Sequence, residues 1–253
     1  MKIKIIFANI ALLFFLSPIA SWAKDYNASL FGIKSDGITL NTQSIQKAID
    51  FIHEKGGGKL DFYVGRYLTG TIQLKSNVQI ELKEGAVLVG TTSIHDYLAV
   101  DGKRGLIVAE GQEHIGVFGK GVIEGQGAGV YQALSLQIKK GYLTENPVDA
   151  SPAIVTMSHC KDIRIEGLHV QNACGDALYF SQSQGIQLKD VAIKNTVLPA
   201  LRGIGLVACE EVTCQKLFIE SSGAEFSANA ACKTVTLENC KSAAGKLLGV
   251  AKK

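Results

Sequence analysis

The 253-residue chain has little of what several classes of protein require. It contains only four prolines and one tryptophan, and aromatic residues make up 7% of it. Its formal net charge is +3, so it lacks the concentrated basic surface that nucleic acids and anionic membranes attract. Its N-terminal apolar stretch, Ile5–Ala20, falls short of the roughly 20 residues of a spanning helix. We therefore expect no nucleic-acid partner and no membrane insertion.

Patterns typical of metal and cofactor sites are also missing. The five histidines include no pair at metal-ligand spacing such as i, i+4, so we expect no metal and no cofactor. All six cysteines follow residue 159. Cys209 and Cys232 have the spacing of residues on neighbouring repeats, where a disulfide is feasible in an exported chain, but stacked free thiols would fill such a turn equally well. The sequence leaves both arrangements open.

The N-terminus has the order of features of a secretory signal peptide. Lys2 and Lys4 precede the apolar stretch, and Ser21-Trp22-Ala23 has the small-x-small pattern of a cleavage site. We expect cleavage after Ala23, which predicts a secreted or periplasmic protein. Because no cysteine lies near this site, we expect no lipid anchor. Since no Pro-, Ser- or charge-rich linker divides residues 24–253, we expect them to form a single domain.

Short alternating segments recur along the chain. Taking Ile163, Ile186, Val212 and Val235 as anchors, the segments repeat every 23 to 26 residues, which is a solenoid period. Strands this short cannot bury an apolar face alone, but parallel stacking gives them a continuous core. The sequence therefore predicts an all-β fold, a parallel β-helix.

The small residues support the same register. Cys160, Ser183, Cys209 and Cys232 each lie three positions before an anchor, which predicts one inward turn repeated in every coil. An antiparallel sandwich would need hairpin signals such as Asn-Gly between adjacent strands, and we expect no hairpins.

One helix is expected before the coils, at about residues 42–55. Ile45, Ala48, Ile49 and Ile52 share one face at i, i+3, i+4 and i+7, and Gly56–Gly58 end the segment. Because the exposed end of a solenoid has to be covered, this helix is predicted to belong to an N-terminal cap over about residues 26–58.

A family resemblance follows from these motifs. The run from "FGIKSDG" through "SIQKAIDFIHEKGGGKL" to "LKSNVQIELKEGAVLVGT" resembles the N-terminal part of the pectin-lyase-like right-handed β-helix proteins. The later "GVIEGQG" and "SPAIVTMSHCKDIRIEGLHVQNA" resemble the polygalacturonase-type glycoside hydrolases of family 28. The resemblance covers roughly residues 26–240. It implies a right-handed β-helix, a secreted carbohydrate-active protein, and hydrolysis of galacturonan-type chains by carboxylates.

The catalytic motifs of that family are altered in this chain. "ALRGIGL" stands where members have "NTDGIDI", which puts Arg202 at the place of an aspartate, and "GAEFSANA" stands where they have "GDDCIAIK". The "GHG" and "RIK" motifs that follow in the family are missing, so we interpret the family's catalytic residues as not retained. Arginine can neither protonate a leaving oxygen nor activate water at neutral pH.

Aligning the coils suggests another constellation. Asp176, Arg202 and Glu225 each lie ten residues before the next anchor, so we expect a column with Arg202 between two carboxylates. The column is either a structural ion-pair ladder, or an active site in which Asp176 and Glu225 are catalytic. In a third interpretation Arg202 and the nearby Lys189 bind the carboxylate of a sugar.

Two classes of function follow. In the first, the protein is an enzyme acting on acidic, pectic polysaccharide with a rebuilt active site. In the second, it is a glycan-binding or structural β-helix, a degenerate or truncated enzyme. The partner in both is a polysaccharide containing uronic acid. The insertion at residues 129–150, which carries Tyr131 and Tyr142, is either a surface loop or short helix, or a border of the groove that holds the glycan.

Overall fold

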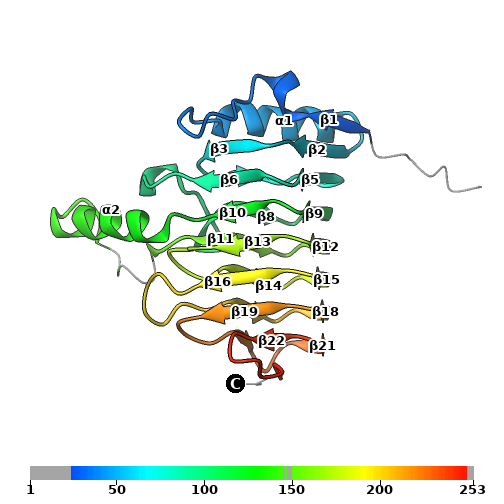
Figure 1. Ribbon diagram of the computed structural model, residues 1–253, viewed down its shortest axis with the longest axis vertical. Helices are drawn as coiled ribbons and strands as arrows, with labels where there is room; N and C mark the ends of the chain where they lie inside the picture. The colour runs from blue at the N-terminus through cyan, green and yellow to red at the C-terminus, as the bar shows by residue number, and fades with distance from the viewer. Residues whose placement is uncertain (1–23, 145, 147–149, 250–253) are drawn as a thin grey trace, which may run out of the picture.

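The computed structural model describes residues 24–144, 146 and 150–249. They form a right-handed parallel β-helix, a stack of coils with the N-terminal coil at one end (Figure 1). The expected signal peptide, residues 1–23, lies outside the described residues. In the part of the chain that is described, no helix combines the length and the hydropathy needed to cross a bilayer.

The coils build three sheets, here called A, B and C. Sheet A has eight strands: β1 (Asp25–Asn27), β2 (Gly58–Phe62), β5 (Val78–Leu82), β9 (Glu113–Gly119), β12 (Lys161–Glu166), β15 (Gln184–Lys189), β18 (Glu210–Gln215) and β21 (Lys233–Glu238). Sheet B has seven: β3 (Gly65–Thr69), β6 (Ala86–Gly90), β10 (Val122–Glu124), β13 (His169–Gln171), β16 (Ala192–Asn195), β19 (Phe218–Ser221) and β22 (Lys241–Ser242). Sheet C contains β4 (Ile72–Gln73), β8 (Lys103–Glu110), β11 (Ala153–Ser158), β14 (Leu178–Ser181), β17 (Ile204–Val207) and β20 (Phe226–Ala228), and β7 (Ala99–Val100) pairs with β8.

The predicted register is confirmed on sheet A. Ile163 pairs with Ile186, Ile186 with Val212, and Val212 with Val235, all in parallel. Each anchor places an apolar side chain directly above the one in the preceding coil, so the core is continuous through the stack.

The predicted stack of small residues is also present. Cys160, Ser183, Cys209 and Cys232 are all buried. The Cys160 backbone amide donates to the Ser183 hydroxyl at 3.1 Å, and the Cys209 amide donates to the Cys232 sulfur at 3.4 Å. This turn therefore repeats from coil to coil, with a small buried side chain at each place where the backbone passes from sheet C to sheet A.

The predicted helix is α1 (Thr42–Glu54), and it covers the first coil (Figure 1). Its apolar face, Ile45, Ala48, Ile49 and Ile52, is completely buried. The chain leaves the helix through Gly56 and Gly57, whose φ angles of 93° and 111° favour glycine. The helix thus closes the apolar end of the solenoid.

The expectation that hairpins are absent is wrong at one place. Strands β7 and β8 pair in antiparallel register around a two-residue turn at Asp101 and Gly102, both with positive φ. Asp-Gly is a strong signal for this turn type, and Asn-Gly was too narrow a criterion. The insertion forms a second helix, α2 (Gly127–Lys139), which projects from the stack (Figure 1).

Candidate functional site

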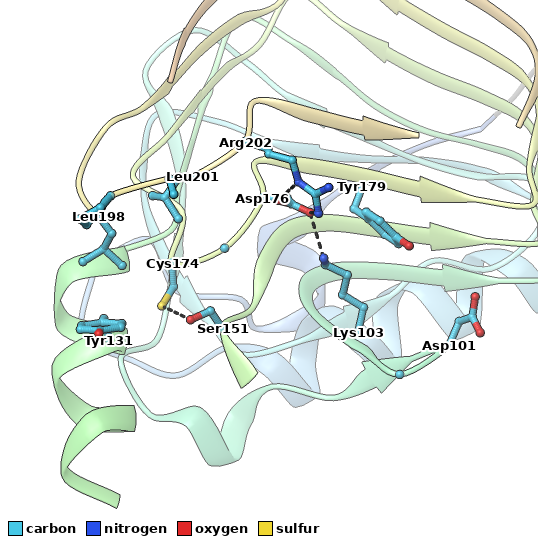
Figure 2. Close-up of a pocket in the computed structure, with 14 residues that line it drawn as sticks. Asp101, Lys103, Tyr131, Ser151, Cys174, Asp176, Tyr179, Leu198, Leu201 and Arg202 are labelled. Carbon is cyan, nitrogen blue, oxygen red and sulfur yellow. Dashed lines mark hydrogen bonds and ion pairs between the residues drawn. The ribbon is translucent and has the colours of Figure 1, made fainter. Parts of the chain in front are cut away.

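A pocket of about 730 Å³ lies at the amino-terminal ends of neighbouring strands of sheet C. Lys103 begins β8, Ser151 precedes β11, Asp176 precedes β14 and Arg202 precedes β17. Because parallel strands start at the same edge of a sheet, residues far apart in sequence meet there (Figure 2). The pocket is lined by Asp101, Gly102, Lys103, Tyr131, Ser151, Cys174, Gly175, Asp176, Tyr179, Leu198, Pro199, Ala200, Leu201 and Arg202.

Asp176 is held by two cations. Arg202 donates to it in bidentate fashion, from Nε to Oδ1 and from Nη2 to Oδ2, both at 2.9 Å. The Lys103 ammonium lies 2.9 Å from the same Oδ2. The Asp176 side chain is 8% exposed, whereas that of Arg202 is 39% exposed and reaches into the pocket. The hydrogen bonds to Asp176 raise the pKa of Arg202 above its ordinary value, so the guanidinium is fully charged.

Lys103 also lies over an aromatic ring. Its ammonium is 4.3 Å from the centroid of the Tyr179 ring, a cation–π distance. Burial raises the pKa of Tyr179, which keeps its hydroxyl protonated and able to donate. Gly205, beside Tyr179 on the next strand, leaves room for this arrangement, since a Cβ there would lie 3.2 Å from the ring.

Asp101, at the tip of the β7–β8 hairpin, is anchored to sheet C. Its Oδ2 accepts hydrogen bonds from the hydroxyls of Ser158 at 3.0 Å and Ser181 at 3.1 Å. The Ser158 hydroxyl also lies 2.7 Å from Nδ1 of His159. The hairpin thereby becomes a fixed wall of the pocket.

A buried asparagine sets the spacing of the two charged segments. Asn195 is completely buried, and its side-chain amide donates to the carbonyl of Gly175 at 2.9 Å and to that of Arg202 at 3.0 Å. The first carbonyl is that of the residue before Asp176, and the second is that of Arg202 itself. Asn195 therefore ties together the two backbone segments that carry the ion pair.

The expected column is present for Asp176 and Arg202 but not for Glu225. Ile204 pairs with Phe226, which places Ala224 rather than Glu225 level with Arg202. Among the residues that the structure describes, no hydrogen bond or ion pair joins Glu225 to Arg202. The anchors on sheet A are correctly spaced, but the interval from Phe226 to Val235 is one residue longer than the equivalent interval from Ile204 to Val212, so the register on sheet C shifts by one residue. The third charged group of the cluster is therefore not Glu225 but Lys103, which contacts Asp176.

Lys189 does not lie near Arg202. It ends β15 on sheet A, where its ammonium is 3.1 Å from Oε1 of Glu166, and it does not line the pocket. Lys189 lies 13 positions before Arg202 in the sequence, which does not show that the two cations belong to different sheets. The catalytic and substrate-binding roles assigned to Asp176, Glu225, Arg202 and Lys189 stay predictions.

Three side chains of the polar part of the pocket were not predicted: Asp101, Lys103 and Tyr179. The Asp-Gly pair at 101–102 is the signal that could have revealed the hairpin, but nothing local indicates that the hairpin tip lies beside Asp176. Tyr131 on α2 lines the pocket, and the hypothesis that the insertion borders a glycan-binding groove stays a prediction. Tyr142 is 71% exposed and lies elsewhere.

The cysteines are free thiols, including Cys209 and Cys232. Within the pocket, the Cys174 thiol donates to the Ser151 hydroxyl at 3.3 Å, and burial raises the pKa of Cys174. Among the described residues, no group of three or more His, Cys, Asp or Glu side chains is arranged to hold a metal ion.

Comparison with known proteins identifies the family and supports the β-helix fold. The model of the family "Glycosyl hydrolases family 28" matches residues 57–250. The solved structure of a candidate glycosyl hydrolase from Parabacteroides merdae is similar at 36% identity and a TM-score of 0.86, covering 91% of this chain and all of that one. The family 28 exopolygalacturonase of Yersinia enterocolitica is similar in fold, with 19% identity and a TM-score of 0.70 over 82% of this chain and 44% of its own.

A curated relative, the "Probable polygalacturonase" of Vitis vinifera, is 26% identical over 220 residues, which is 78% of this chain and 43% of that protein. The chain spans less than half the length of the first curated relatives that it matches.

Proposed function

Because the chain belongs to glycosyl hydrolase family 28, we propose that it recognises an acidic polysaccharide and holds a uronic-acid unit in the pocket at the edge of sheet C. One observation carries this proposal: two cations, Lys103 and Arg202, share the single buried carboxylate of Asp176. Asp101 also lines the pocket, but its Oδ2 accepts hydrogen bonds from the hydroxyls of Ser158 and Ser181. Lys103, Arg202 and Asp176 together have one positive charge in excess. A sugar carboxylate that enters the pocket would meet that charge at short range.

Lys103 is the better placed of the two cations for this contact. Arg202 uses Nε and Nη2 on Asp176, whereas Lys103 has three N–H donors and makes one contact with that carboxylate. The Tyr179 ring beneath the ammonium restricts its movement. A preorganised donor of this kind loses little freedom when a ligand binds.

The test is a titration of the protein with oligogalacturonides by calorimetry, comparing Lys103→Met with Lys189→Met. Both variants lose one lysine charge, but Lys189 lies on sheet A, outside the pocket. We expect Lys103→Met to weaken binding about tenfold or more, as for a lost charge-assisted hydrogen bond, and Lys189→Met to bind normally. Weaker binding by Lys189→Met alone would move the binding site to sheet A, and no binding by the unaltered protein would refute the proposal.

Hydrolysis is a second candidate, because two carboxylates, Asp101 and Asp176, line the same pocket and glycoside hydrolysis uses a pair. The hydrogen bonds favour binding over hydrolysis. Both oxygens of Asp176 accept from cations and Oδ2 of Asp101 accepts from two hydroxyls, so neither group is presented as a proton donor. We expect little or no reducing-end release from polygalacturonate. Release that Asp176→Asn and Asp101→Asn abolish would establish hydrolysis.

We also propose export from the cytoplasm. The support is the order of charged, apolar and small residues up to Ala23. N-terminal sequencing of the mature protein tests it, with Lys24 as the expected first residue.

A further inference from the structure

The pocket has two ends of different chemistry (Figure 2). One end is ionic, with Asp101, Lys103, Asp176 and Arg202 around the Tyr179 ring. The other end is formed by Tyr131 of α2 and by the segment from Leu198 to Leu201 that leads into β17. The side chains at this second end are largely hydrocarbon.

The apolar end is part of a packed surface. Tyr131 and Leu198 pack against the hydrophobic core, and Leu201 is 8% exposed. The backbone of this segment is held as well, since the amide of Leu201 donates a hydrogen bond to the Ser222 hydroxyl at 3.0 Å. The wall is therefore built before a ligand arrives.

The C–H face of a sugar ring can lie against the ring of Tyr131, but such a wall is a poor partner for the hydroxyl-bearing edge of an unsubstituted sugar. A sugar ring carries hydroxyl groups on most of its carbons, and a hydroxyl that leaves water without a new hydrogen bond loses free energy. An ester group has a methyl end that gains from the same transfer. The two ends of the pocket thus match a ligand that is charged on one side and apolar on the other.

We infer that the pocket selects a uronic-acid unit that carries an O-acetyl ester, with the sugar carboxylate at Lys103 and the acetyl methyl group between Tyr131 and Leu198. This inference rests on the proposed function and names the substrate class of the same site. Burial of one methyl-sized group strengthens binding about fourfold.

The experiment compares two ligands made from one preparation: O-acetylated oligogalacturonides, and the same oligomers after alkaline deacetylation. Calorimetry gives the dissociation constant of each for the unaltered protein and for two leucine variants. Leu198→Asn alters the apolar wall, and Leu136→Asn is the matched control, since Leu136 is 48% exposed on α2 and does not line the pocket. Thermal unfolding checks that each variant folds, and Leu198→Ala replaces Leu198→Asn if the latter does not.

We expect the unaltered protein and Leu136→Asn to bind the acetylated oligomers at least about fourfold more tightly, and the Leu198 variant to bind both ligands equally. Equal binding of both ligands by the unaltered protein, still sensitive to Lys103→Met, would overturn this inference and leave the proposed function intact. A preference that survives in the Leu198 variant would also overturn it. Failure to bind either ligand would refute the proposed function together with the inference.

Discussion

At the scale of the residue, the arginine in the apolar run "ALRGIGL" is explained by Asp176. A lone guanidinium beside a buried strand is unfavourable, but this one forms a bidentate pair with a nearly buried carboxylate. The carboxylate in turn has a second cation in Lys103. Arg202 is consequently one of two cations on one acid, and not a cation between two acids.

This arrangement predicts which mutations are coupled. Arg202→Met should lower the free energy of unfolding by about 1 kcal/mol, because Lys103 still neutralises Asp176 and Arg202 is partly exposed. In double-mutant cycles by chemical denaturation, Arg202→Met should couple with Asp176→Asn by about 1 kcal/mol. With Glu225→Gln it should be additive to within about 0.5 kcal/mol, as for residues without contact. Strong coupling to Glu225 would contradict the register found on sheet C.

At the scale of the element, the first strands of sheet A carry an ion cluster. Lys59 of β2 contacts Asp25 and Asp61 at 3.5 Å and also pairs with Glu81 of β5, which is 2.6 Å from Lys83. Burial acts to raise the pKa of Glu81, but the hydrogen bonds and charges of the two lysines outweigh it, and the pKa is lowered. Burial dominates for Asp61, whose pKa is raised.

The opposite shifts predict opposite effects of pH on stability. Glu81 contributes stability that is complete above its ordinary pKa of 4.5 and is lost as the pH falls through its lower folded value. Asp61 has a raised pKa, so its ionised form destabilises the fold at higher pH, and this unfavourable contribution is relieved as the pH falls through its folded value toward its ordinary pKa of 3.8. The free energy of unfolding should therefore fall less steeply with decreasing pH in Glu81→Gln than in the unaltered protein, and more steeply in Asp61→Asn. Denaturant titrations between about pH 3 and 6 measure both slopes, and the same sign for the two variants would contradict the assignment.

At the scale of the whole molecule, the stack buries its thiols. All six cysteines follow residue 159 and all are buried. Burial raises the pKa of Cys209 to about 11, and it also raises the pKa of Cys160, Cys174, Cys214 and Cys240. Since the thiolate is the reactive form, these side chains act as small apolar residues of the core.

Thiol labelling checks this description. Without reductant at pH 8, the native protein should react with a thiol reagent about tenfold or more slowly than the unfolded protein, and unfolding should release all six thiols. The comparison of reaction rates in buffer and in denaturant is the measurement. Fewer than six reactive thiols after unfolding would indicate a disulfide, with Cys209 and Cys232 the first pair to examine.

Periodicity predicted the fold because the forces that set it are repeated in every coil. The anchors at 163, 186, 212 and 235 pair as their spacing indicates, since a one-residue slip would turn apolar side chains outward. The helix at 42–54 was predicted for a similar reason, because the residues of its apolar face recur at helical spacing in the sequence. Asp176 and Arg202 were predicted to meet because one coil separates them.

The amino-acid sequence by itself thus determined the β-helix, its register on sheet A, its helical cap and the pairing of Asp176 with Arg202. Only the tertiary structure decided the other members of the pocket. Lys103 and Asp101 reach it from a hairpin many residues earlier, while Glu225 and Lys189 are excluded by a shifted register and by a different sheet. The physical reason is that the core register depends on short-range apolar repeats, whereas the pocket depends on turns of unequal length between them. Those lengths have no periodic pattern, so which side chains meet in the pocket is determined only when the coils are stacked.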